Sequence, residues 1–198
     1  MHHQQTSSEQ TKGGLAGHVL RRSIHVFMII VPIVYYFWAA SLAQAWHMTT
    51  WQLVLIFLGV FCSYEIVRIR CGWLAFGQRF HERYHISSMI WGIIAIAVVL
   101  IFTPDQCYAI PIIAACAVGD PLLGELRAHV KPLWAVVAGI SVIALVWWLC
   151  GLWMPVVWWW PLVLAPLTTV AELPNLRGID DNALMMLAPL VLMIIFTL

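Results

Sequence analysis

Four carboxylates and one amide in this chain have the residue types that bind a divalent cation. Asp180, Asp181 and Asn182 follow one another just before an apolar run, Glu172 stands shortly upstream, and Asp120 lies in the middle of the chain. Carboxylate and amide oxygens are the ligands that Mg²⁺ prefers, and Mg²⁺ commonly reaches such sites together with nucleotide phosphates. A helix N-terminus, where Asp and Asn are favoured, accounts for one of these residues but not for the set. The set therefore predicts phosphoryl or nucleotidyl transfer, with the four carboxylates as metal ligands.

Basic and histidine side chains suited to phosphate stand at the start of the first apolar run. Arg21 and His25 are four residues apart and share one face of a helix. Arg21 and Arg22 each offer a planar guanidinium that matches phosphate oxygens, although Arg22 is also explained as an anchor at the membrane surface. Either His25 or one of the aspartates could accept the proton of a substrate hydroxyl, and the sequence does not choose between them.

Two further motifs leave alternatives open. Glu65 and Arg68 are three residues apart near the end of an apolar run, as expected for either a structural ion pair or a ligand site. His81, Glu82 and His85 match the H-E-x-x-H pattern of zinc metalloproteases, in which two histidines hold Zn²⁺ and the glutamate is the general base. The neighbouring arginines disfavour a cation there and favour a short amphipathic segment at the lipid headgroups.

The chain that positions these residues is predicted to be an all-α, polytopic integral membrane bundle. Its 198 residues are 63% hydrophobic and 10% charged, whereas soluble domains carry about 25% charged residues. The net charge of +1 gives no basis for nucleic-acid binding. Seven apolar runs near the length of a membrane-spanning helix occupy about residues 24–45, 51–67, 86–102, 107–123, 133–149, 153–171 and 183–198.

The distribution of charge predicts the orientation of these spans. With a cytoplasmic N-terminus, all ten Lys and Arg residues fall on the cytoplasmic side, as the positive-inside rule requires. Residues 1–17 are expected to form a disordered polar start, and residues 18–198 a single transmembrane catalytic domain. Pro121 lacks an N–H and disfavours helix at Asp120, so a break or kink is expected in the fourth span. Such a break is tolerated where it lines a polar cavity.

Taken in order, these clusters resemble those of the CTP-dependent membrane lipid kinases, the family of dolichol kinase, phytol kinase and the CTP-using diacylglycerol kinase. The resemblance covers about residues 20–190. It rests on Arg21-Arg22-Ser23-Ile24-His25, on Glu65 with Arg68, on the segment 79–82, on Gly119-Asp120, and on Glu172 followed by Gly178-Ile179-Asp180-Asp181-Asn182. The last stretch is the most distinctive. The segment after Asp120 departs from the family pattern and retains only Lys131 of its next motif.

The resemblance implies transfer of the γ-phosphoryl group of CTP, with Mg²⁺, to the hydroxyl of an isoprenoid alcohol or diacylglycerol at the cytoplasmic face. It implies catalytic roles for Asp120, Asp180, Asp181 and His25, and phosphate binding by Arg21, Arg22, Gly119, Lys131 and Asn182. The expected partners are the nucleotide and a lipid alcohol in the bilayer, with homo-oligomerisation left open. Three alternatives stand beside this hypothesis: another CTP-using membrane enzyme such as phosphatidate cytidylyltransferase, a zinc membrane protease, and a non-catalytic lipid-binding relative.

Overall fold

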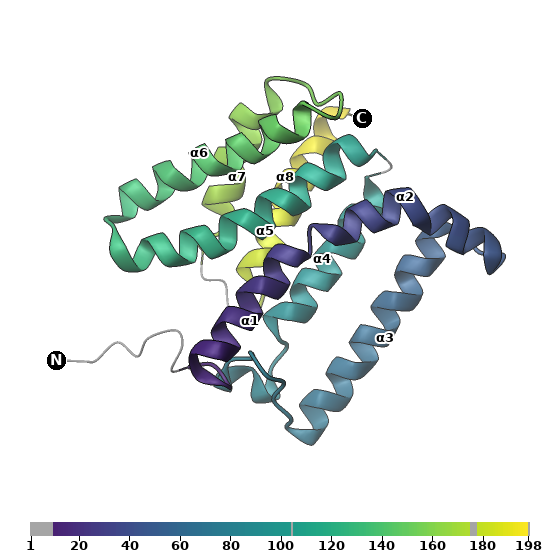
Figure 1. Cartoon of the computed structure of the whole chain (residues 1–198), viewed down its shortest axis with the longest axis vertical. Coiled ribbons are helices and arrows are strands. Elements are labelled where there is room, and N and C mark those ends of the chain that lie inside the picture. Colours follow the sequence, from purple (N-terminus) through teal and green to yellow (C-terminus); the bar gives the residue numbers. More distant parts are fainter. Residues whose placement is uncertain (1–9, 104, 175–177, 198) are drawn as a thin grey trace.

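The computed structural model describes residues 10–103, 105–174 and 178–197, and within these ranges the chain is all-helical (Figure 1). The elements are α1 (Gly14–Phe27), α2 (Ile30–Ala45), α3 (Thr50–Cys71), the 3₁₀ helix η1 (Phe80–Tyr84), α4 (Ser88–Phe102), α5 (Gln106–His129), α6 (Pro132–Gly151), α7 (Trp160–Ala171) and α8 (Asp181–Thr197). An isolated β-bridge joins Thr11 to Arg79 and ties the start of the described chain to the loop between α3 and α4. The prediction of an all-α fold is confirmed for the described residues.

Several helices are long and apolar enough to cross a membrane. α3, α5 and α6 meet this requirement singly, and α1 and α2 meet it together as one span bent by 45°. α4, α7 and α8 are apolar but shorter. The 12 residues of α7 extend only about 18 Å at 1.5 Å per residue, whereas the hydrocarbon layer is about 30 Å thick. Length and composition therefore support three to four spans, and the seven-span count and its orientation stay predictions.

The first apolar run differs from its prediction at both its start and its middle. α1 begins at Gly14, so Arg21 and Arg22 lie within the helix and not before it. Apolarity alone marked the start at residue 24, because charged side chains were excluded from the span. The run then bends between α1 and α2, where Pro32 occupies the first turn of α2. A proline is tolerated there because the first N–H groups of a helix have no partner within that helix. Of the predicted disordered start, residues 1–9 lie outside the described residues.

Pro161 and Pro121 differ in their position relative to the helices: one lies at a helix start and the other within a helix. Helix was predicted from residue 153, but α7 begins only at Trp160, with Pro161 in its first turn. Conversely, α5 continues through Pro121, and the helix break predicted beside Asp120 is absent. Pro121 removes one backbone hydrogen bond, but Ala117, Gly119 and other residues around it are buried against neighbouring helices. Packing of this kind holds a helix together where a single bond is missing.

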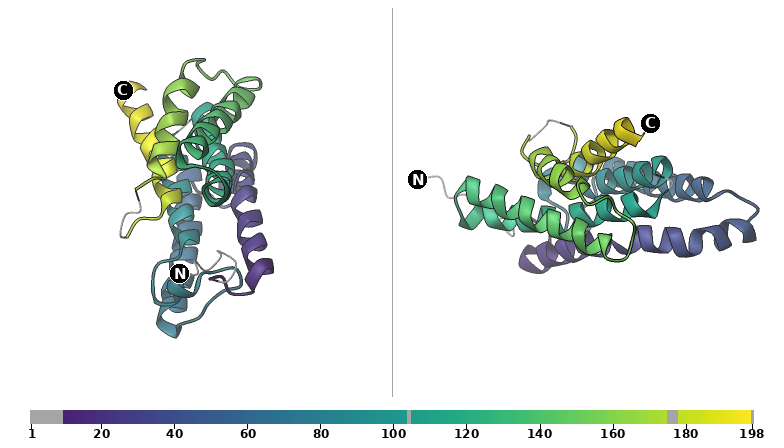
Figure 2. Two further views of the ribbon diagram at one scale, coloured as in Figure 1. Left: turned by 90° about the vertical axis from the view of Figure 1, so that its left-hand side faces the viewer. Right: turned by 90° about the horizontal axis from the view of Figure 1, so that it is seen from above.

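α5 is the central helix of the bundle. It packs against α1, α2, α4, α6, α7 and α8, and together with α4, α6, α7 and α8 it supplies the main buried apolar cluster, including the fully buried Trp147. α3 packs against α2 and α4 and buries only Leu53, Glu65 and Arg68. Figure 1 and the right-hand view of Figure 2 show α3 on the side of the molecule opposite α6. This arrangement leaves α3 as an outer helix whose buried residues are mainly polar.

The helix ends that carry the candidate site residues gather at one end of the bundle. In Figure 1 the turns α2–α3, α4–α5 and α6–α7 lie toward the top and right. The start of α1 and the ends of α3 and α5 lie toward the bottom and left, as does the loop between α3 and α4. Antiparallel neighbours joined by short turns produce this alternation, and it brings residues from distant parts of the chain to the same end.

Candidate functional site

His25 of α1 and Asp120 of α5 make the central contact of the candidate site. Nε2 of His25 lies 3.5 Å from Oδ2 of Asp120 and 3.4 Å from the carbonyl oxygen of Cys116, one turn earlier on α5. Because both neighbours are oxygens that accept hydrogen bonds, Nε2 carries the hydrogen and Nδ1 is the basic nitrogen of the neutral ring. The packing of α1 against α5 thus brings a histidine and a carboxylate together across 95 residues of sequence.

The carboxylates from the end of α7 and the start of α8 lie near Asp120. Burial raises the pKa of Asp180, and the negative charge of Asp120 adds to this increase, while the N–H of Asn182 and the charge of Arg21 oppose it. Burial also raises the pKa of Glu172 to about 7, against the opposing charge of Arg127, and the charges of Asp120 and Asp181 add to the increase. The predicted acidic residues therefore share one electrostatic environment.

The two adjacent arginines of α1 have different partners. Arg21 donates from Nη2 to Oγ of Ser88 at 2.6 Å, and its Nη1 lies 3.5 Å from Oε1 of Glu82. Arg22 forms an ion pair with Glu125 of α5 at 2.7 Å, in a more open position. Arg21 and His25 line the same cavity, as expected from their four-residue spacing. Arg21 is thus placed with the acidic residues and the cavity, whereas Arg22 ties α1 to the end of α5.

The carboxylates do not form a complete protein cage for a metal. Among the described residues there is no group of three or more His, Cys, Asp or Glu side chains arranged to hold an ion. Mg²⁺ needs only one or two protein carboxylates when nucleotide phosphates and water supply its other ligands. The charge of Asp120 contributes to the raised pKa of Asp180, so these two carboxylates are the ones that would hold such an ion.

Gly119 and Lys131 have surroundings that differ from those of a phosphate site. Gly119 is buried, and a Cβ at this position would lie 2.9 Å from Cδ1 of Ile143 and 3.1 Å from Cε of Met185. The glycine therefore permits the close approach of α5 to α6 and α8. Lys131 is exposed at the N-cap of α6, on the loop after α5. Gly119 precedes Asp120 directly but serves the packing of the helices, and no hydrogen bond or ion pair of Lys131 with His25 or Asp120 is found among the described residues.

A cavity of about 430 Å³ lies beside this pair. Its polar side chains come from the second half of α1, the loop between α3 and α4, and the starts of α4 and α8: Arg21, His25, Gln78, Glu82, Ser88 and Asn182. The lining is apolar at and beyond the end of α1, farther along α4, and on α2 and α3: Phe27, Met28, Val31, Phe61, Ile93 and Ile96. The end near the loop, here called the polar end, therefore carries the polar side chains together with the apolar Ile24, Phe76 and Met89, and the far end is apolar.

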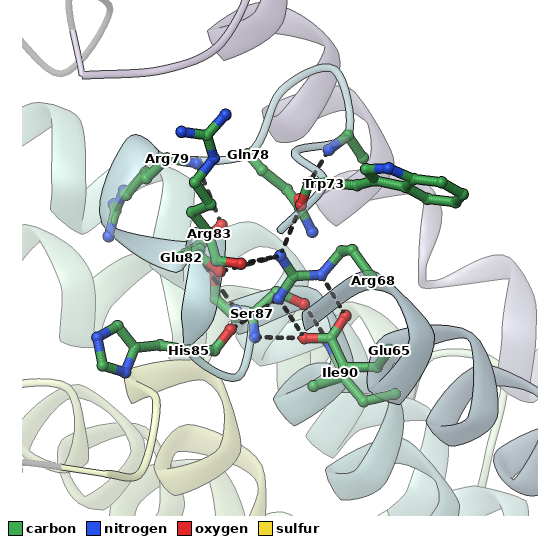
Figure 3. Close-up of polar contacts among 12 residues, drawn as sticks. Glu65, Arg68, Trp73, Gln78, Arg79, Glu82, Arg83, His85, Ser87 and Ile90 are labelled. Carbon is green, nitrogen blue, oxygen red and sulfur yellow. Dashed lines mark hydrogen bonds and ion pairs between the residues drawn. The ribbon is translucent and has the colours of Figure 1, made fainter. Parts of the chain in front are cut away.

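Arg68 organises the loop that forms the polar end of this cavity (Figure 3). Its fully buried guanidinium donates to both carboxylate oxygens of Glu65, at 2.8 and 2.9 Å. It also donates to the carbonyl oxygens of Trp73, Glu82 and His85, at 3.1, 2.9 and 2.7 Å. Of the two alternatives that the sequence left open for Glu65 and Arg68, this geometry is that of a structural ion pair.

The H-E-x-x-H segment lacks the geometry of a zinc helix. His81 lies in the short 3₁₀ helix η1 and His85 lies after its end, and both side chains are exposed. In a 3₁₀ helix residues three apart are aligned, so residues four apart do not share a face. Glu82 is buried and accepts hydrogen bonds from the backbone N–H of Arg79 and from Ser88 Oγ. Its carboxylate is therefore engaged within the loop.

Sequence reasoning did not single out Gln78 and Ser88 among the functional candidates. The two adjacent serines before an apolar run are a typical helix start, and Oγ of Ser87 indeed accepts from the N–H of Ile90 to cap α4. That signal accounts for Ser87 alone. No pattern in the neighbouring sequence indicated that Ser88 and Gln78 line a cavity together with residues of α1 and α8. The packing of these helices and the loop against one another creates that cavity.

Comparison with known proteins adds no further assignment. No protein-family model, no curated protein and no solved structure matches this chain. The assignment of the site therefore depends on its own geometry.

Proposed function

We propose that this chain is a membrane enzyme that transfers the γ-phosphoryl group of a nucleotide to the hydroxyl of a lipid alcohol. CTP is the nucleotide expected from the resemblance to the CTP-dependent lipid kinases. The proposal places seven spans in the membrane with the N-terminus in the cytoplasm. The His25–Asp120 pair and the acidic residues around it would then lie at the cytoplasmic face.

One observation carries the proposal: a histidine that pairs with a carboxylate also lines a cavity whose polar side chains gather at one end. His25 belongs to both the pair and the cavity lining. The charge of Asp120 raises the pKa values of Asp180 and Glu172. A substrate with a hydroxyl and a hydrocarbon chain matches such a cavity, and phosphoryl transfer needs mainly positioning and charge stabilisation.

The reaction assigns a task to each group, and Asp120 has two. Nδ1 of His25 accepts the proton of the lipid hydroxyl, whose oxygen forms a bond to the γ-phosphorus, while the bond from that phosphorus to the β–γ bridging oxygen breaks and the nucleoside diphosphate leaves. Asp120, 3.5 Å from Nε2, stabilises the imidazolium that forms. Mg²⁺, held with the nucleotide by Asp120 and Asp180, would neutralise phosphate charge. Arg21 contributes a positive charge beside Asp180.

The test is a transfer assay on the full chain purified in detergent. Labelled CTP, Mg²⁺ and a panel of isoprenoid alcohols and diacylglycerols should yield a labelled lipid phosphate. Asp120→Asn should lower kcat by at least about a hundredfold, and His25→Ala by about 10²–10⁴-fold, the range for loss of a general base.

Glu125→Gln is the matched control for Asp120→Asn. Glu125 lies on the same helix, but its side chain is half exposed and contacts Arg22 and His129. This variant should keep its transfer rate within about threefold. Equal activity of Asp120→Asn and Glu125→Gln would refute the site assignment. Lipid binding without transfer from any nucleotide would support the non-catalytic alternative, and stoichiometric zinc in the pure protein would support the protease.

A further inference from the structure

Three side chains that line the same cavity each carry a buried polar atom without a hydrogen-bond partner, within the part of the chain that the structure describes. These atoms are Nη1 of Arg21, whose 3.5 Å ion pair with Glu82 is not a hydrogen bond, Nε2 of Gln78 and Oδ1 of Asn182. Gln78 and Asn182 are each only 6% exposed. A buried polar group without a partner costs free energy. Three such groups at one cavity therefore point to a ligand that supplies the missing hydrogen bonds.

The orientation of the Gln78 amide follows from its surroundings. Oε1 of Gln78 accepts a hydrogen bond of 2.8 Å from the backbone N–H of Ala75, so Nε2 is the end without a partner. The backbone of Gln78 is also held, because its carbonyl oxygen accepts from the N–H of Lys12 at 2.8 Å. The amide of Gln78 is therefore oriented before any ligand binds, and its Nε2 donor is buried without a hydrogen-bond partner.

The three unpartnered groups have the hydrogen-bonding character that a hydroxyl requires. Arg21 and Gln78 supply two donors, and Asn182 supplies one acceptor. A hydroxyl accepts two hydrogen bonds and donates one. An ammonium group would leave both donors unpartnered, and an ether or a fully ionised phosphate would leave Asn182 unpartnered. Among simple head groups, the alcohol satisfies all three.

The apolar part of the cavity is suited to the chain of such an alcohol and opens toward lipid. Phe27 is 63% exposed although it lines the cavity, and Phe61 of the outer helix α3 is also exposed. The cavity volume of about 430 Å³ lies toward the lower end of the roughly 300–1,000 Å³ typical of small-molecule sites. The cavity therefore accommodates a hydroxyl head and the first part of one chain, with the remainder in the bilayer.

We propose that Gln78, Asn182 and Arg21 bind the hydroxyl of a lipid alcohol at the polar end of this cavity, with Gln78 and Asn182 selecting the hydroxyl over other head groups. This inference rests on the proposed function for the role of the alcohol as acceptor. It adds the residues that choose the substrate, and it predicts binding in the absence of nucleotide. Ser88 and Glu82 hold Arg21 in place through contacts of 2.6 and 3.5 Å.

The experiment measures head-group preference by competition. The full chain in phosphatidylcholine nanodiscs is labelled with an isoprenoid alcohol that carries a photoreactive tail. Unlabelled alcohol, methyl ether and primary amine of the same chain compete for labelling. On the native chain the alcohol should compete about tenfold better than the ether or the amine, because each of these leaves a buried group unpartnered.

Two variants test the assigned residues. Gln78→Glu keeps the acceptor for the Ala75 N–H but replaces the free donor with an acceptor. It should weaken competition by the alcohol about tenfold and improve competition by the amine. Asn182→Leu removes the acceptor, so the alcohol and the ether should compete equally. Gel filtration and thermal unfolding establish that each variant is folded.

Thr168→Val is the matched control. The Thr168 hydroxyl is also buried without a partner, but it lies in α7 and does not line the cavity. This variant should keep the native preference. The inference is overturned if Gln78→Glu competes like the native chain, or if Thr168→Val loses the preference as well.

The outcomes separate this inference from the proposed function. A preference for alcohol that Gln78→Glu reverses, without transfer from any nucleotide, supports the hydroxyl site and refutes the kinase. Transfer that continues with an unchanged KM for the alcohol in Gln78→Glu supports the kinase and refutes the hydroxyl site.

Discussion

At the scale of single residues, the fold changes the chemistry of Glu172 most. Its side chain is 3% exposed at the end of α7 and pairs with Arg127 of α5. Burial raises its pKa from 4.5 to about 7 even though the charge of Arg127 opposes the increase. Near neutral pH this carboxyl therefore exists in both protonation states, and its charge depends on that of its acidic neighbours.

This raised pKa predicts a pH dependence of stability. Between pH 4.5 and 7 the folded chain retains a proton on Glu172 that the unfolded chain has released. Its contribution to the free energy of unfolding is therefore complete below about pH 4.5 and decreases as the pH rises to about 7, by roughly 3 kcal/mol at most. Glu172→Gln should flatten this part of the profile, as measured by unfolding in detergent at a series of pH values.

Two features make that measurement specific. Burial also raises the pKa of Asp180, so some dependence on pH should persist in Glu172→Gln. Glu125→Gln removes a carboxyl whose side chain is 55% exposed, and it should leave the profile unchanged. A Glu172→Gln profile as steep as that of the native chain would contradict the assignment.

At the scale of elements, the loop between α3 and α4 depends on one arginine. Arg68 joins the end of α3 to carbonyl groups spread from Trp73 to His85. Oε1 of Glu65 in turn accepts from the N–H of Ser87 at 2.7 Å, immediately before α4. Both side chains are buried, and this network positions Gln78 and Glu82 at the cavity.

Removal of Arg68 should therefore destabilise the protein strongly. Arg68→Met leaves Glu65 buried and unpaired, a situation that typically costs about 3–5 kcal/mol. Unfolding in detergent followed by tryptophan fluorescence measures this loss, and limited proteolysis should cut the segment 72–87 sooner than in the native chain.

The neighbouring arginine provides the comparison. Arg70 is exposed on the same helix, so Arg70→Met should change the free energy of unfolding by less than about 0.5 kcal/mol. If Arg68→Met and Arg70→Met lost equal amounts of unfolding free energy, the hydrogen-bond network of Arg68 would stabilise the fold no more than an exposed charge does.

At the scale of the whole molecule, the distribution of basic residues and the bundle arrangement lead to one topological prediction. The predicted topology has seven crossings. Because seven is an odd number, the two ends of the chain should lie on opposite sides of the membrane. The ten Lys and Arg residues favour the side of the N-terminus as the cytoplasmic one.

Epitope tags at the two ends provide the measurement. In sealed vesicles of known orientation, a tag before residue 1 and a tag after residue 198 should be accessible from opposite sides. A tag inserted after the exposed Gly151, the last residue of α6, should share the side of the C-terminal tag. Accessibility of both end tags from one side would rule out seven spans.

The all-α character of the described chain and its apolar runs could be predicted from the sequence alone, as could the residue types of the candidate site. These properties are local: hydrophobic runs select helices, and the four-residue spacing of Arg21 and His25 puts both on one face. Helix bounds were less predictable. Pro121 lies within α5 while Pro161 begins α7, because packing decides whether a helix tolerates a missing bond.

Which polar groups lie next to one another is evident only in the folded chain. The 3.5 Å contact of His25 with Asp120, the burial of Glu172 and the cavity shared by Gln78 and Asn182 all join distant segments. The same structure showed that Glu65 and Arg68 pair with each other and that Gly119 is a packing residue. The physical reason is that burial and charge fields depend on neighbours brought together by helix packing, and spacing along the chain does not encode those neighbours.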